Sequence, residues 1–340
     1  MFKRKTYDFV RENKTVDIVK RKKVIVAEDI ILEKHPVRKP VTVFNPSVVL
    51  TDNEIRIFAR VVLGYFTYAS AIAEIRTNFD DFYRTEKYIG KLIVLPDSKY
   101  DIWGAEDPRA YYIGDNVYIT YCGRTVNYFD PSIRTERTLP ITAVEVGDEQ
   151  WDKIMVTRLS EDFRSFVISD KDAFLVKNGD EYKLFHRLHL KNEQFYLVVS
   201  KLNQELPEEL SEVPVTNTEV VLEAEKFEDK LGWGTPPIKV DKNKYVLLLH
   251  GVESETKAYK VLAAELNNNL ELIAVTPYYI MEPKEIYERY GDRPYVVFPC
   301  GACLLDDKLL ISYGAADSAI GIGEIDISEL MSILDKGRIW

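Results

Sequence analysis

The stretch from Glu106 to Arg124 reads EDPRAYYIGDNVYITYCGR. It opens on polar residues, runs through a short apolar segment to the turn GDN, and returns through a second segment in which apolar and polar residues alternate. Asn, Asp and Gly suit the tight turns that join paired strands, and alternation places one face of a strand on a core. The stretch therefore predicts a β-hairpin.

Four more stretches repeat this pattern. They are NPSVVLTDNEIRIFAR from Asn45, KDAFLVKNGDEYKLFHR from Lys171, TPPIKVDKNKYVLLLH from Thr235 and PCGACLLDDKLLISYGAAD from Pro299. Successive hairpins end 63 to 67 residues apart, which leaves room for two further strands in each unit. Four-stranded units repeated radially are the blades of a propeller. We therefore expect an all-β fold, a five-bladed β-propeller with four-stranded blades, as a single catalytic domain over residues 1–340.

The two ends of the chain lie outside this repeat. Residues 1–40 are expected to form an N-terminal extension, and residues 326–340 a C-terminal helix. A 3.6-residue period also predicts a short peripheral helix over residues 283–291. Both ends are candidate contact elements of a homo-oligomer.

Composition excludes several classes of partner. A net charge of −10 disfavours nucleic acid, and the basic cluster at residues 20–23 is predicted to be a solvated loop or strand edge. No run approaches the roughly 18 apolar residues that span a membrane. The charged first residues do not resemble a signal peptide, and three cysteines form no even-numbered framework. We expect a cytoplasmic protein.

The second strand of every hairpin ends on a polar residue. These residues are Arg60, Arg124, Arg187, His250 and Asp317, and Asn45 and Asp107 occupy the matching start of the first two units. Equivalent positions of propeller blades converge near the axis, where cations without an anion would repel one another. The pattern predicts a polar site that binds an anion such as phosphate. The alternative is that these residues cap strands or pair across blades.

Asp107 is the best candidate for an acid, because Pro108 limits its backbone and Arg109 supplies a close charge. The alternative is an Asp–Pro turn held by Arg109. Trp103 and Trp233 are candidate sugar platforms or core residues. We expect no metal site, because Cys300 and Cys303 are offset by three on a strand and face apart, and no cofactor, because nucleotide-binding motifs are absent.

Several motifs in order resemble glycoside hydrolase family 130. They are VFNPSVV, WGAEDPRAYYIGDNVYITY, KDAFLV with YKLFHR, GWGTPPIKV with VLLLHGV, and YYIMEPKEIYERYGDRPYVVFPCGA with ISYGAADSAIGIG, which together span about Val43 to Gly323. The resemblance implies a five-bladed propeller with an axial active site. It also implies inverting phosphorolysis of β-mannosides, β-1,2 or β-1,4 linked, by inorganic phosphate as co-substrate, with release of α-mannose 1-phosphate.

The resemblance also implies roles for individual residues. Asp107 corresponds to the proton donor. Phosphate-binding positions are Arg124, Lys177, Arg187 and His250, with Arg134 and Arg137 as alternatives to Arg124. Substrate-binding positions are Asn45, Arg60, Glu106, Arg109 and Asp317.

Two other functions compete with phosphorolysis. A β-mannoside hydrolase on the same fold would need a second carboxylate to activate water. A non-catalytic carbohydrate-binding propeller would need no acid in the EDPR turn. The cationic strand ends favour the phosphorylase, because phosphate is already an anionic nucleophile and needs positioning and positive charge from the protein.

Overall fold

The computed structural model describes residues 2–5, 7, 9–51, 53–130, 132–147 and 150–339. All five predicted hairpins are confirmed as antiparallel strand pairs. The pairs are β4 (Thr42–Leu50) with β5 (Glu54–Val62), β8 (Ala105–Ile113) with β9 (Asn116–Arg124), β12 (Val167–Asn178) with β13 (Glu181–Leu190), β17 (Ile238–Asp241) with β18 (Lys244–Glu253), and β21 (Val297–Leu305) with β22 (Lys308–Ala315).

Further antiparallel strands extend each hairpin. They are β6 (Ser70–Asn78) and β7 (Tyr88–Val94), β10 (Thr138–Gly147) and β11 (Gln150–Leu159), β14 (Phe195–Leu202) and β15 (Ser211–Leu222), β19 (Tyr259–Leu266) and β20 (Leu272–Val275), and β23 (Ala319–Asp326), while β16 (Glu228–Trp233) adds to β18. Within the described residues these strands form four sheets, because β11 and β15 pair in parallel and fuse two of the groups.

The N-terminal segment is built into the sheets rather than set apart as an extension. Strand β1 (Lys3–Arg4) pairs with β15, and β3 (Ile30–Leu32) pairs with β7. Strand β2 (Lys20–Ile25) pairs with β23 and becomes the fourth strand of the last group, at its edge. The basic cluster thus lies on a strand edge, one of the two settings predicted for it.

A buried ion pair fixes this segment further. The Arg11 guanidinium binds both carboxylate oxygens of Glu228 in β16, with Nη1 2.6 Å from Oε1, and Tyr279 donates its hydroxyl hydrogen bond to the same oxygen at 2.6 Å. Arg11 is 4% exposed. Such a pair is costly to break, because removal of one partner leaves a buried charge uncompensated.

The helices are short and peripheral, as the sequence predicts. They are α1 (Phe79–Phe82), α2 (Glu161–Arg164), α3 (Ile286–Arg289) and α4 (Ile327–Leu334), with single 3₁₀ turns η1 (Ala27–Asp29) and η2 (Asp335–Gly337). Asp326 caps α4 by accepting a hydrogen bond from the Glu329 amide, and the helix buries Leu330 and Leu334. None of the helices in the described ranges has the length and apolar content needed to cross a membrane.

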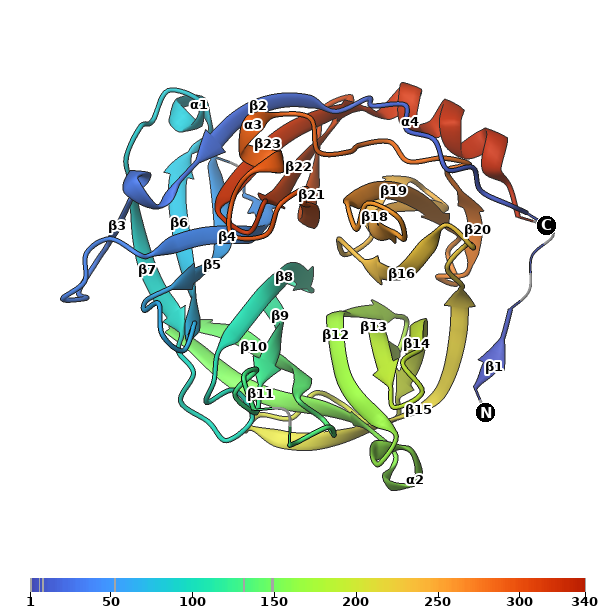
Figure 1. Cartoon of the computed structure of the whole chain (residues 1–340), viewed down its shortest axis with the longest axis horizontal. Helices are drawn as coiled ribbons and strands as arrows, with labels where there is room; N and C mark the ends of the chain where they lie inside the picture. The colour runs from blue at the N-terminus through green and yellow to red at the C-terminus, as the bar shows by residue number, and fades with distance from the viewer. Residues whose placement is uncertain are drawn as a thin grey trace.

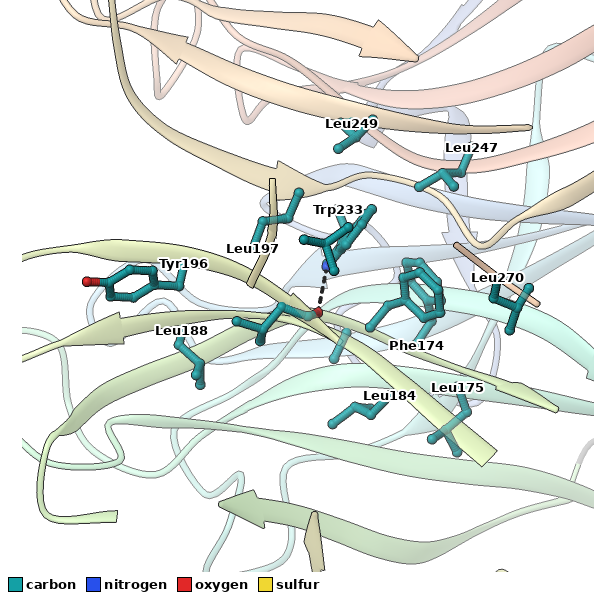
Figure 2. Close-up of a cluster of buried hydrophobic side chains, with 14 of the residues drawn as sticks. Phe174, Leu175, Leu184, Leu188, Tyr196, Leu197, Trp233, Leu247, Leu249 and Leu270 are labelled. Carbon is teal, nitrogen blue, oxygen red and sulfur yellow. Dashed lines mark hydrogen bonds between the residues drawn. The ribbon is translucent and has the colours of Figure 1, made fainter. Parts of the chain in front are cut away.

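The groups of strands are arranged in a ring, with β4, β8, β12 and β21 toward its centre (Figure 1). Strand β4 contacts both β21 and β8, and β12 contacts β8, so the inner strands pack against one another. Trp233 is fully buried between neighbouring groups (Figure 2), and its indole donates hydrogen bonds to the His186 and Val198 carbonyls at 3.1 Å. Trp233 is therefore a core residue and not a sugar platform.

Candidate active site

A cavity of about 430 Å³ opens where the inner strands converge. Strand starts and strand ends predicted from the repeat meet there. Six of the predicted site residues line the cavity: Asn45, Arg60, Glu106, Asp107, Arg187 and Asp317.

Three inner strands direct polar side chains into this cavity through the same local feature, a β-bulge with a residue at positive φ. Asn45, Asp107 and Asp172 each lie at a register shift in β4, β8 and β12, with φ of 48°, 51° and 54°. A β-bulge re-aims a side chain, and Asn and Asp are the non-glycine residues that best tolerate positive φ. Gly314 leaves the space that Asn45 needs, because a Cβ there would lie 1.8 Å from Asn45 Oδ1.

Asp107 is surrounded by donors. Asn45 Nδ2 donates a hydrogen bond to Oδ1 at 2.8 Å, and Arg60 Nη1 does so at 3.1 Å. Burial alone would raise the pKa of Asp107, but Arg60 and Lys171 outweigh it and hold the pKa below its ordinary value. The carboxylate is therefore ionised before substrate binds.

The negative charge of Glu106 is neutralised by more neighbours than that of Asp107. Arg60 Nη2 lies 2.8 Å and Arg124 Nη1 3.5 Å from Oε1, and the Tyr128 hydroxyl donates a hydrogen bond to Oε2 at 3.2 Å. Lys171 Nζ lies 3.4 Å from Oε2. Carboxylates within the protein thus relieve the predicted mutual repulsion of the axial cations, as expected if charged residues pair across blades.

A second buried cluster centres on Asp172. Arg187 Nε lies 2.5 Å, Arg109 Nη2 3.3 Å and His250 Nε2 3.5 Å from its carboxylate oxygens. Burial opposes ionisation, but Arg187 and His250 prevail and keep the pKa of Asp172 well below its usual range. Burial lowers the pKa of His250 to about 4, so its ring is neutral near pH 7.

Three predicted site residues lie behind the cavity wall. Arg109 is 1% exposed and binds the carbonyls of Asp107 and Gly234. His250 is completely buried against Gly232, where a Cβ would lie 2.2 Å from Nε2. Arg124 donates to the carbonyls of Trp103 and Thr67. In this arrangement these side chains support the lining residues and do not reach the cavity.

The structure does not bring Lys177 to the cavity. Lys177 lies on the same strand as Lys171 but at the opposite end, where it is exposed beside a separate depression. The alternatives to Arg124 are also engaged elsewhere. Arg134 pairs with Glu193 on the surface, and Arg137 donates to carbonyls of its own loop.

The cavity lining also contains Lys230 and Arg293, two cations that were not predicted from the sequence. Lys230 in β16 lies 5.1 Å from the Phe195 ring centroid and 5.6 Å from that of Tyr259, and among the described residues no carboxylate forms an ion pair with it. Burial, together with Arg187 and Arg293, lowers the pKa of Lys230 to about 7. Lys230 precedes the fourth hairpin on an additional strand, so the repeat gave no signal for it.

Asp317 differs from Asp107 and Asp172, because its pKa is raised rather than lowered. It follows β22 with φ of 51°, and no residue in the described ranges donates a hydrogen bond to its carboxylate. Burial and the charge of Asp107 raise the pKa of Asp317 to about 6, against the opposing effect of Arg60. Asp172 and Lys171 were also missed, although Lys171-Asp172 occupies the third strand start that matches Asn45 and Asp107.

Comparisons with known proteins point to one enzyme family. A model of glycoside hydrolase family 130, described as beta-1,4-mannooligosaccharide phosphorylase, matches residues 9–336. Beta-1,2-mannobiose phosphorylase from Thermoanaerobacter sp. (strain X514) is 25% identical over 87% of this chain and 96% of its own length. 1,2-beta-oligomannan phosphorylase from the same strain is 26% identical over 71% and 75%. The solved beta-1,2-mannobiose phosphorylase from Listeria innocua superposes with a TM-score of 0.73 at 20% identity, covering 94% and 99%.

Proposed function

The chain belongs to glycoside hydrolase family 130, and from that membership we propose that it cleaves β-mannosides with inorganic phosphate, inverts the anomeric centre and releases α-mannose 1-phosphate. The protein is a carbohydrate-active enzyme. The observation that carries the proposal is that one cavity holds Asn45, Asp107 and Asp317 together with Arg187 and Lys230, and that Lys230 has no ion-pair partner among the described residues.

Several polar residues of the cavity suit a sugar. Asn45, Asp107 and Asp317 present hydrogen-bonding groups to hydroxyls, and Phe195 and Phe298 supply apolar faces in the same cavity. Asp107 is proposed as the proton donor. Because it is ionised in the free protein, it has to gain a proton as the ligands bind, and an incoming phosphate dianion would raise its pKa by like-charge repulsion.

The cations of the same cavity suit phosphate. Lys230 has aromatic neighbours and no ion-pair partner within the described chain, so its charge remains available to an anion. Arg187 and Arg293 line the same cavity. Phosphate held there needs no general base, because it arrives as an anion, and the protein supplies orientation and positive charge.

Hydrolysis is the second candidate, and Asp317 is the observation that favours it. A carboxylate without a hydrogen-bond donor in the described chain is available to activate water as the base of an inverting hydrolase. The pKa of about 6 leaves most of it ionised at neutral pH.

The experiment is a product analysis with and without phosphate. β-1,2- and β-1,4-mannobiose are both assayed, because the family description names one linkage and the relatives name the other. Saturable dependence on phosphate with mannose 1-phosphate as product supports phosphorolysis. Free mannose at equal rates in phosphate-free buffer supports hydrolysis.

The finer architecture and setting belong to the same proposal. Within the described ranges, five antiparallel groups of strands, two of which are joined where β11 pairs with β15, support a count of five blades in one domain. Free Cys122, Cys300 and Cys303 support a cytoplasmic location. The reaction as proposed needs phosphate as co-substrate and no cofactor.

A further inference from the structure

Two loops beside the cavity are fastened together by one buried arginine. Residues 63–69 join β5 to β6, and residues 125–130 follow β9. Arg124 Nη2 donates to the Thr67 carbonyl at 2.9 Å and the Tyr68 carbonyl at 3.3 Å, and its guanidinium lies 4.5 Å from the Tyr128 ring centroid. Tyr128 lines the cavity and donates a hydrogen bond to Glu106, so residues 125–130 form part of the cavity wall, and Arg124 holds residues 63–69 beside them.

A third segment joins the same structure. The Tyr68 hydroxyl donates a hydrogen bond to Asp292 Oδ1 at 2.7 Å, and the Asp292 amide donates to Ser318 Oγ at 2.8 Å, next to cavity-lining Asp317. The loop backbones are therefore positioned relative to the cavity by hydrogen bonds on both sides.

Large aromatic side chains project from these fastened loops into solvent. Phe66 is 93% exposed, Tyr65 75% and Phe129 74%. Phe66 and Phe129 are adjacent in sequence to residues that Arg124 contacts, since Phe66 precedes Thr67 and Phe129 follows Tyr128. Exposed aromatics that contribute nothing to the core, on loops tied to a residue that lines a ligand cavity, indicate a binding surface.

We propose that Tyr65, Phe66 and Phe129 form an outer subsite that stacks on sugar rings of a mannoside longer than a disaccharide. The inference rests on the proposed function and specifies its substrate as an oligosaccharide. The apolar face of a pyranose ring fits an aromatic face, and the rings that extend from a bond cleaved inside the cavity have to pass the mouth. Arg124 then acts as a positioning residue for the loop that carries Tyr65 and Phe66.

The test compares chain lengths. kcat/KM with saturating phosphate is measured for β-mannosides of two to five units in the wild type, the Tyr65→Ala/Phe66→Ala double variant and a Tyr112→Ala control. Tyr112 is 45% exposed at the far end of β8. We expect the wild type to prefer the longer substrates, and the double variant to lose about tenfold on these and less than about twofold on the disaccharide. The control should match the wild type at every length.

Three results would overturn the proposal: no length preference in the wild type, an equal loss at all lengths, or a change of oligomeric state in light scattering, which would make the aromatics a contact between copies. Calorimetric titration with mannotetraose in the absence of phosphate tests the outer subsite even where no turnover is seen, because the double variant should bind this sugar more weakly than the wild type. If the disaccharide is cleaved but longer substrates are not preferred, only the outer subsite is contradicted. If the wild type cleaves no mannoside, the proposed function is contradicted.

Discussion

Replacing Lys230 with methionine tests the proposed phosphate site. The substitution keeps an unbranched, flexible side chain and removes its charge, and it breaks no ion pair within the described residues. A hydrogen bond to a charged group contributes about 1.5–3 kcal/mol, so the KM for phosphate should rise about 10- to 150-fold. kcat should change much less. Thermal stability should hold or increase, because a charge that burial disfavours is removed.

Lys177→Met is the matched control, since it removes the same charge from the exposed end of β12 and should leave the KM for phosphate unchanged. The assay is initial-rate release of mannose 1-phosphate at varied phosphate between pH 6 and 8.5. Lys230 is charged below its pKa of about 7 and loses that charge above it, so the ratio of KM between variant and wild type should shrink as pH rises. The ratio cancels the titration of phosphate itself. A Lys230 variant that matches the Lys177 control would refute this placement of phosphate.

Three further outcomes are expected. Asp107→Asn should lower kcat by about 100-fold or more while mannoside binding in calorimetry survives, and near-full activity would show that EDPR is only a turn. Arg11→Met should lower the urea-derived free energy of unfolding by about 3–5 kcal/mol by stranding buried Glu228, whereas Arg4→Met, at an exposed pair, should change it by less than about 1 kcal/mol. Asp317 keeps its proton to a higher pH in the folded state than in the unfolded state. The free energy of unfolding of the wild type should therefore fall, relative to that of Asp317→Asn, as the pH rises from about 4 to 6. Parallel curves of unfolding free energy against pH would contradict the raised pKa.

The hairpins could be predicted because their signals are local. Alternation and turn residues lie within about twenty positions of each other, and the five units reinforce one another. The closing pair of β2 with β23 could not be predicted in this way. Its partners lie some 300 residues apart, and the segment KRKKVI reads as polar because it forms an edge.

A residue's place in the repeat predicts which strand starts and strand ends converge, but not which of their side chains reach the cavity. Asn45, Asp107 and Asp317 reach the cavity because equivalent strand ends converge. Partner choice depends on tertiary structure, so the sequence did not show that Arg124 is buried against Glu106. The same reason explains Lys177, because a shift of six residues along β12 separates the cavity from the opposite end of the strand.

The pairing of β2 with β23 also has a consequence for synthesis. A ribosome makes β2 almost 300 residues before its partner, so this segment emerges with no sheet to join. Its four basic residues in six positions keep it from pairing with other nascent chains during that interval. Strand β2 can join the last sheet only after β23 has been made, which makes completion of the ring a late step in folding. A chain arrested before Ala319 should therefore remain open and sensitive to protease near its N-terminus.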